Sequence, residues 1–290
     1  MQIRILQPLG WCAGVKSAIN NVHQIINKHH GSSIYLLGWL VHNKSIIEEI
    51  KRKRVTILHD NFQNKLALVK SIKSTNAVIV LPTHGTTKEV LTYVNKYFKY
   101  VYDLTCKKLC RNFQIVNDLI KKDYQIIYYG KRNHPETNVI SSIAPNIIIV
   151  ENQDDIKRIK FGHLKKYALI NQSTFSENFT SKIKLLLSQR IKHLTYFNTT
   201  CPVTSFRQKH LEHLTKTELL LIIGDKSSNN ANQLLSLAKE KKIKSKLISN
   251  INQIKTPLFT SIKRLTIITA TSVSPLQVHQ IINKIKTTKR

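Results

Sequence analysis

Short apolar runs alternate with segments of helical periodicity along the whole chain. Runs such as Ile3–Leu6, Ala77–Leu81 and Leu219–Ile223 have the length and composition of buried strands. After a polar loop, each is followed by a segment in which apolar residues recur three or four positions apart, as Ala18 and Val22 do. Strands that alternate with helices predict parallel sheets, so we expect an α/β fold.

The remaining elements follow the same alternation. Further strands are expected at 34–43, 55–58, 100–105, 125–129, 147–150, 167–170, 194–200, 247–248 and 265–269. Further helices are expected at 45–53, 88–96, 154–159, 177–189 and 276–286, with others that end near residues 121, 214 and 241. Polar loops follow the carboxyl ends of the strands, which is where open α/β sheets bind their ligands.

Three of the four cysteines recur at nearly equal intervals. Cys12, Cys106 and Cys201 lie about 95 residues apart, a period too long for a solenoid repeat, and each stands between a strand-like run and a helical segment. This spacing predicts three α/β lobes, each with one cysteine at the carboxyl end of a strand. We place the lobes at 13–103, 104–198 and 199–290, and we expect the strand in 1–12 to join the third.

A thiol at the start of a helix is suited to metal binding or nucleophilic chemistry, because the helix dipole and the unpaired N–H groups favour the thiolate. A lone cysteine in such a place is more often a small buried apolar residue. Three thiolates that converge would suit an iron–sulfur cluster with one iron left open, or a zinc site with three cysteine ligands.

Polar loops at strand ends carry further candidate residues. Histidines occupy three of these loops, as His42, His84 and His134, and can donate hydrogen bonds to phosphate oxygens. Ser228, Asn229 and Asn230 stand where a helix begins, which is a favourable place for an anion. These loops predict a diphosphate site. Glu136, beside His134, is a carboxylate that could move protons near a metal cluster.

The net charge of +30 is the most unusual feature of the composition. Lysine and arginine are spread along the chain, and lysine, asparagine and isoleucine, all abundant here, share A/T-rich codons, so nucleotide bias suffices to explain the charge. We therefore regard nucleic-acid binding as unlikely. The charge would still attract acidic partners and anionic substrates over long distances.

Other features of the sequence indicate the cellular compartment. The N-terminus enters strand-like sequence without the apolar segment of a signal peptide, and no apolar stretch approaches 18 residues. With few cysteines, these features predict a cytoplasmic protein without a membrane span.

The motifs and their order resemble the 4-hydroxy-3-methylbut-2-enyl diphosphate reductase family over residues 1 to about 285. The likeness is carried by Cys12-Ala13-Gly14-Val15, Val41-His42-Asn43, His84-Gly85, Asp103-x-Thr105-Cys106, His134-Pro135-Glu136, Gln172-x-Thr174, Cys201 and the Ser228–Asn232 loop. Each motif alone is weak, whereas their order and spacing together are specific.

The resemblance implies three lobes with pseudo-threefold symmetry around a central [4Fe–4S] cluster, held by the three cysteines and with one open iron. It implies removal of the hydroxyl group of 4-hydroxy-3-methylbut-2-enyl diphosphate to give isopentenyl and dimethylallyl diphosphate. Glu136 would deliver protons, and an acidic ferredoxin or flavodoxin would deliver electrons. The substrate would be held by His42, His84, His134, Ser173, Ser228, Asn229 and Asn230.

Five positions depart from the family's pattern. Ser173 stands where threonine is usual and keeps the hydroxyl, and Asn229 stands where a serine or similar small residue is usual and can still hydrogen-bond. Lys107 stands where proline usually follows the second cysteine. Val273 stands where a serine usually binds the phosphate. By that position it is counted among the substrate-binding residues, and we expect the backbone, with Ser272 or Ser274, to offset the lost hydroxyl. Cys110 is additional, and at four residues from Cys106 on a helix it could be a fourth ligand.

Two alternatives remain open at this point. The chain could be a basic nucleic-acid-binding protein with a structural zinc site, or an enzyme that keeps the fold and the cluster without activity.

Overall fold

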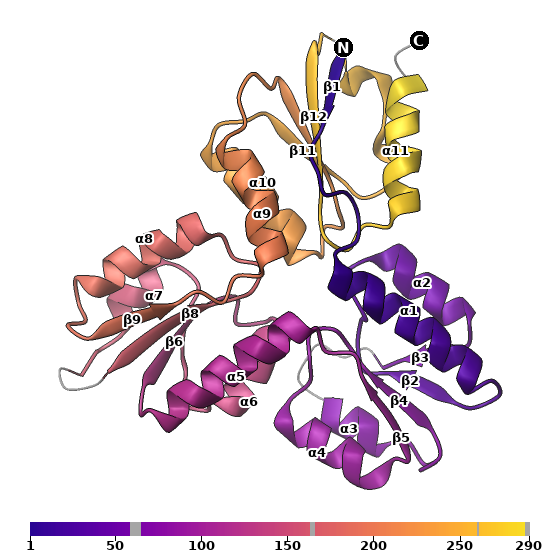
Figure 1. Cartoon of the computed structure of the whole chain (residues 1–290), viewed down its shortest axis with the longest axis vertical. Coiled ribbons are helices and arrows are strands. Elements are labelled where there is room, and N and C mark those ends of the chain that lie inside the picture. The colour runs from indigo at the N-terminus through magenta and orange to yellow at the C-terminus, as the bar shows by residue number, and fades with distance from the viewer. Residues whose placement is uncertain (59–64, 163–165, 260, 288–290) are drawn as a thin grey trace. The chain divides into compact units, whose positions relative to one another are not determined.

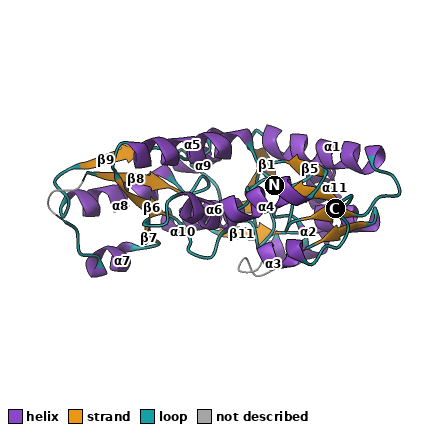
Figure 2. Cartoon of the chain, turned by 90° about the horizontal axis from the view of Figure 1, so that it is seen from below, coloured by secondary structure: helices purple, strands orange, loops and turns teal. Residues whose placement is uncertain are grey.

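The computed structural model describes residues 1–58, 65–162, 166–259 and 261–287, and within them the chain forms three sheets of four parallel strands each (Figure 1). The expected α/β class is therefore confirmed. Among the described residues each strand except β11 is followed by an α-helix, and Figure 2 shows the helices and strands in different colours.

The strands are β1 (Gln2–Ile5), β2 (Ile34–Leu36), β3 (Val55–Ile57), β4 (Val78–Leu81), β5 (Tyr100–Asp103), β6 (Gln125–Tyr129), β7 (Ile148–Val150), β8 (Tyr167–Asn171), β9 (Leu194–Phe197), β10 (Leu219–Ile223), β11 (Ser245–Ile248) and β12 (Arg264–Thr269). The α-helices are α1 (Ala13–Lys28), α2 (Lys44–Arg52), α3 (Lys65–Lys70), α4 (Lys88–Tyr97), α5 (Lys107–Lys121), α6 (Pro135–Ile143), α7 (Gln153–Arg158), α8 (Glu177–Ser188), α9 (Pro202–Glu212), α10 (Asn229–Glu240) and α11 (Pro275–Thr287). Two short 3₁₀-helices are η1 (Ile251–Gln253) and η2 (Thr256–Leu258).

The chain divides into two compact units. Unit 1 comprises Met1–Lys16, His42–Ile46 and Cys201–Arg290, and it contains a sheet with the strand order β1-β12-β10-β11. In this sheet Gln2–Ile5 pairs with β12, so the first strand of the chain lies beside the last. Helix α11 covers one face of the sheet, and α9 and α10 lie on the other (Figure 1).

Unit 2 comprises Ser17–Val41 and Ile47–Thr200 and contains two sheets, ordered β3-β2-β4-β5 and β7-β6-β8-β9. Alternate residues of β6 face different helices. Ile127 and Tyr129 pack with residues of α7 and α8, whereas Ile126 and Tyr128 pack with residues of α5 and α6. Period-two alternation thus gives the two adjacent tyrosines separate environments. The boundaries proposed for the three lobes remain predictions.

Three elements differ from the sequence-based expectation. The strand expected at 34–43 ends at Leu36, because Gly38 has φ of +101°, in the left-handed region that glycine favours and strands do not use. Leu37 and Leu40 are nevertheless buried, so the apolar run reflects packing of a loop. Helix α3 was not expected, since six residues are too few to display a clear helical period. Helix α6 was not expected either, because the sequence assigned His134-Pro135-Glu136 to a polar loop, whereas Pro135 begins the helix.

Within the described ranges, none of the helices combines the length and the apolar character that crossing a membrane would require.

Candidate active site

Three cysteines occupy equivalent places at the starts of helices. Cys106 and Cys201 are the N-cap residues of α5 and α9, with φ of −60° and −63° and ψ of 127° and 126°. Cys12 directly precedes α1, and the backbone N–H of Val15 donates to its Sγ atom over 3.4 Å. All three are partly exposed, and none of the cysteines forms a disulfide within the described residues. Each thiol therefore lies at the positive end of a helix, as the sequence predicts.

The chemistry of this donor set fits an iron–sulfur cluster. Thiolates are the usual ligands of iron in such clusters, and a helix N-terminus lowers the free energy of the thiolate. Among the residues that the structure describes, no three His, Cys, Asp or Glu side chains gather closely enough to hold a single metal ion.

Cys110 has a different environment. Its side chain is exposed, and its Sγ atom lies 4.0 Å from the carbonyl oxygen of Thr105. Desolvation, followed by the negative charges of Asp103 and Cys106, raises the pKa of its thiol. A raised pKa reduces the thiolate fraction, which makes Cys110 a poorer ligand than a thiol at a helix N-terminus.

Glu136 is a buried carboxyl group held by one neighbour in unit 2. It lies in the first turn of α6 with 1% of its surface exposed. Ser173, in the loop after β8, donates its backbone N–H to Oε1 over 2.8 Å and its hydroxyl to Oε2 over 2.6 Å. Burial nevertheless raises the pKa of Glu136 to about 7, against the opposite effect of these two bonds. Such a group can both hold and release a proton near neutral pH.

Tyr128 is a residue of this site that sequence reasoning missed. It is fully buried on β6, and its hydroxyl makes no hydrogen bond of ordinary geometry within the described residues. It lies close enough to Glu136 to lower the pKa of that carboxyl group, while burial and the nearby carboxylate raise the pKa of the phenol well above its usual value. Its neighbours Tyr124 and Tyr129 are also tyrosines, so the sequence holds no signal that distinguishes Tyr128.

His134 and His84 lie on neighbouring loops of unit 2. His134 is the N-cap of α6, and its Nδ1 atom accepts the backbone N–H of Glu136 over 3.1 Å. This bond assigns the proton of a neutral ring to Nε2. The two imidazole rings meet edge to face, with their centroids 5.7 Å apart. The structure therefore brings together His84, His134, Glu136 and Ser173, which the sequence singled out separately.

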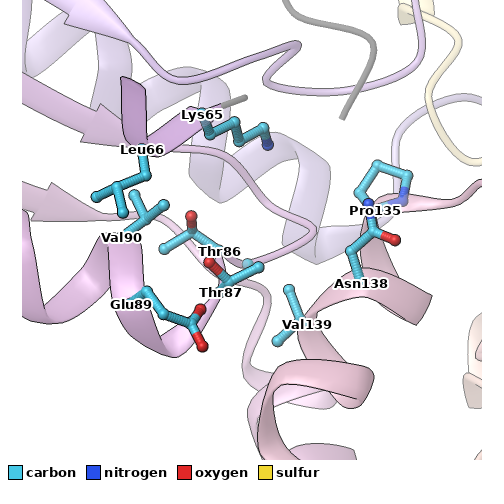
Figure 3. Close-up of a pocket in the computed structure, with 10 residues that line it drawn as sticks. Lys65, Leu66, Thr86, Thr87, Glu89, Val90, Pro135, Asn138 and Val139 are labelled. Carbon is cyan, nitrogen blue, oxygen red and sulfur yellow. The ribbon is translucent and has the colours of Figure 1, made fainter. Parts of the chain in front are cut away.

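The loops that carry these histidines border a cavity of about 200 Å³ in unit 2 (Figure 3). Gly85 and Pro135, which follow His84 and His134, both line it. Gly85 has φ of +82°, a conformation that residues with a side chain rarely adopt, and a Cβ atom there would make a tight contact of 3.1 Å with the Phe113 ring, so both features favour glycine.

The His42 loop is tied to the loop that follows β12 in unit 1. Ser272 donates its hydroxyl to the carbonyl oxygen of His42 over 3.0 Å, and Asn43 donates its side-chain amide to the carbonyl oxygen of Ser272 over 2.8 Å. Burial lowers the pKa of His42 to about 4, although Asp225 acts in the opposite direction. His42 is therefore a neutral imidazole at neutral pH, with one N–H to donate.

The Ser228 loop begins helix α10 in unit 1. Ser228 is the N-cap, and its Oγ atom accepts the N–H of Ala231 over 3.4 Å. Asn229 and Asn230 are buried in the first turn, and the Asn230 amide nitrogen contacts the hydroxyl of Thr204 at 2.9 Å. The Oδ1 atom of Asn230 is buried without a hydrogen-bond partner among the described residues. The first turn thus presents polar groups that a ligand could satisfy.

The structure corrects the expectation for Val273. Its side chain is 1% exposed and belongs to the apolar core between the sheet of unit 1 and α11. A side chain buried among Val278 and Ile281 has no surface to offer a diphosphate. The Oγ atom of Ser274 accepts the N–H of Gln277 over 3.0 Å, which leaves its hydroxyl hydrogen able to donate. Ser272 is the serine of this loop that contacts the His42 segment.

The chain is similar to known proteins over nearly its whole length. The model of the LytB protein family matches residues 3–286. Curated relatives named 4-hydroxy-3-methylbut-2-enyl diphosphate reductase include that of Malacoplasma penetrans, which is 31% identical over 92% of this chain and 91% of its own length. The relative from Dictyoglomus thermophilum is 31% identical over 99% of this chain and 96% of its own length.

Solved structures of similarly named reductases share the fold. The E-1-hydroxy-2-methyl-but-2-enyl-4-diphosphate reductase from Plasmodium falciparum has a TM-score of 0.88 at 22% identity, covering 97% of this chain and 86% of that one. A structure described as the terminal enzyme of the non-mevalonate pathway has a TM-score of 0.67 at 23% identity, covering 99% and 100%. The family match spans nearly all of the sequence, and the chain therefore belongs to the LytB family.

Proposed function

We propose that the chain is a reductase that removes the hydroxyl group of 4-hydroxy-3-methylbut-2-enyl diphosphate as water. The products are isopentenyl and dimethylallyl diphosphate, and the reaction is the last step of the non-mevalonate pathway. The observation that carries the proposal is the buried carboxyl group of Glu136, whose pKa is about 7, in a chain of the LytB family.

The cofactor that we assign to the chain is a [4Fe–4S] cluster. Cys12, Cys106 and Cys201 would hold it, since each thiol lies at the start of a helix. When bound, such a cluster supplies electrons and a Lewis-acidic iron for the reaction.

Glu136 would supply the proton that lets the hydroxyl group leave as water. Replacement of a hydroxyl group by hydrogen consumes two electrons and two protons and releases one water molecule. A carboxyl group with a pKa of about 7 is about half protonated at neutral pH, so it can donate one proton and be recharged from solvent. Ser173 would keep the carboxyl group in one orientation through its two hydrogen bonds.

The diphosphate would be held by hydrogen-bond donors. The Nδ1 atom of His134 accepts from the backbone, so a neutral ring would carry its N–H on Nε2, and we propose that His134, His42 and His84 donate to the phosphate oxygens. Ser228 accepts a backbone N–H and still has its own hydroxyl hydrogen to donate. The Asn230 amide can turn to present its NH₂ group, because the Thr204 hydroxyl can pair with either end. Asn229, in the same first turn, would contribute a further amide.

Electrons would come from an acidic protein such as a ferredoxin or a flavodoxin. The net charge of +30 favours a negatively charged partner, and attraction of this kind accelerates encounter and weakens with salt.

The test is turnover of the allylic diphosphate under anaerobic conditions, with the purified chain and a chemical reductant. We expect both five-carbon diphosphates as products, together with the broad visible absorption of an iron–sulfur protein. A colourless protein that leaves the substrate unchanged after iron and sulfide have been supplied would contradict the proposal.

A further inference from the structure

Arg207, on α9 of unit 1, is buried to a degree that is rare for a charged side chain. Only 1% of its surface is exposed. One guanidinium nitrogen donates to the carbonyl oxygen of Thr269 over 2.8 Å, and another donates to the carbonyl oxygen of Gly10 over 2.6 Å. Arg207 thus joins three segments that are far apart in the sequence.

Two of these segments lead directly to candidate cluster ligands. Gly10 lies two residues before Cys12, and its N–H donates to the Oγ1 atom of Thr269 over 2.9 Å. The N–H of Cys12 donates to the carbonyl oxygen of Thr271 over 3.0 Å. The third segment is α9, whose N-cap is Cys201. The Arg207 bonds therefore fix the loop that holds one cysteine against the helix that holds another.

The charge of Arg207 has no carboxylate partner within the part of the chain that the structure describes. Its Nε atom is buried and likewise has no hydrogen-bond partner there. Burial lowers the pKa of the guanidinium to about 10, while the nearby Cys12 and Cys201 act in the opposite direction. The group is still charged at neutral pH, and a buried cation requires a nearby anion.

We propose that Arg207 is a positioning residue that orients Cys12 and Cys201 through its backbone hydrogen bonds and balances the negative charge of their thiolates. The inference rests on the proposed function, because it requires both thiolates to hold a cluster. An arginine suits this place better than a lysine, since its planar fork reaches two carbonyl groups at once.

The experiment compares the reconstituted full chain with Arg207→Gln and Arg207→Lys. Two properties are measured: the rate at which a chelator removes iron, and the midpoint potential of the cluster. Glutamine removes the charge and the planar guanidinium group that donates to two carbonyl oxygens. We therefore expect iron loss to be about 10- to 100-fold faster and the midpoint potential of the cluster to be more negative. Lysine keeps the charge alone, so we expect a potential near that of the wild type with faster iron loss.

Arg190→Gln is the matched control. Arg190 also donates to two backbone carbonyl groups, those of Ile156 and Ile159, but it is exposed and belongs to unit 2. We expect it to leave both properties unchanged. A folded Arg207→Gln protein with the iron-loss rate and the potential of the wild type would overturn the inference.

If Arg207→Gln does not fold, as judged by far-ultraviolet circular dichroism, the inference is tested with Arg207→Lys and Thr269→Val instead. Valine at 269 removes the hydroxyl that accepts from Gly10 and, over 3.4 Å, from Arg207, but it keeps the guanidinium charge and its bond to the carbonyl oxygen of residue 269, so we expect faster iron loss at an unchanged potential. Wild-type iron retention in both variants overturns the inference. A wild-type chain that binds a cluster but does not reduce the diphosphate overturns the proposed function alone, and one that binds no cluster overturns both.

Discussion

Ser173 donates two hydrogen bonds to the carboxyl group of Glu136, one from its backbone N–H and one from its hydroxyl, over 2.8 and 2.6 Å. Both bonds favour the charged form, yet burial is the larger effect and leaves the pKa of Glu136 at about 7. Serine therefore limits how far desolvation raises the pKa, and it keeps the proton exchangeable near neutral pH.

Glu136→Gln should remove proton delivery and leave the shape of the site intact. Glutamine can still accept from Ser173 but has no acidic proton, so we expect turnover to fall by about 10²-fold or more, with cluster content and substrate binding retained. Steady-state turnover, iron content and the substrate dissociation constant are the measurements. Glu48→Gln, at an exposed position of α2, is the control. Normal turnover in Glu136→Gln would exclude Glu136 from the reaction.

Ser173→Ala should shift the pH dependence of turnover. If Glu136 acts as an acid, turnover declines as pH rises through its pKa of about 7. Loss of the hydroxyl removes a bond that favours the carboxylate, so the pKa rises and the decline moves to higher pH, by about one unit. Ser173→Thr keeps a hydroxyl and should stay close to the wild type. A decline at unchanged or lower pH in Ser173→Ala would show that the hydroxyl does not act on Glu136.

Tyr128→Phe should also move the decline in turnover to higher pH. The Tyr128 phenol lowers the pKa of Glu136, so its removal raises that pKa. The groups that act on the carboxyl group are Ser173 and Tyr128, and no charged side chain contributes to the shift among the described residues. Tyr129→Phe is the control, because Tyr129 faces the opposite side of the sheet and packs on Phe175. Equal pH profiles for the two variants would argue against a role for Tyr128.

The order of strands and helices could be predicted because the hydrophobic period changes clearly from strand to helix. The prediction was wrong after Leu36, where Leu37 and Leu40 are buried in a loop and so resemble strand residues. It also missed α6, whose first residues were assigned to a polar loop. The cysteines, the histidines and Glu136 were identifiable because polar or reactive groups at strand ends stand out against apolar runs.

Tyr128 and Arg207 could not be found in this way. Tyrosine is common in strands, so its position beside a carboxyl group depends on the packing of α6 against β6. Arg207 stands in a helix with many polar residues, and its burial follows from contacts with Gly10 and Thr269, which are remote in the sequence. A role that depends on contacts with residues remote in the sequence produces no local sequence pattern, so it cannot be predicted from one.

Cysteine-to-serine changes should separate ligands from the additional thiol. Serine oxygen is a poor replacement for a soft thiolate, so each of Cys12→Ser, Cys106→Ser and Cys201→Ser should lose most of the iron. Cys110→Ser should keep iron at the wild-type level, because its thiol is exposed and its pKa is raised. Iron and sulfide per chain after anaerobic purification provide the measurement. Iron loss in Cys110→Ser as severe as in Cys106→Ser would identify Cys110 as a ligand.

Val273→Ser should affect stability and leave substrate binding unchanged. The valine lies in the apolar core of unit 1, where a serine would lose buried apolar surface and place a hydroxyl among aliphatic side chains. We expect the free energy of unfolding, measured by denaturant titration, to fall by about 1–3 kcal/mol.

Ser272→Ala should instead weaken substrate binding by about fivefold, since it removes one hydrogen bond to the His42 carbonyl oxygen and loosens that loop. Dissociation constants measured anaerobically for both variants decide between the two positions. Tighter binding in Val273→Ser would show that residue 273, and not Ser272, faces the diphosphate.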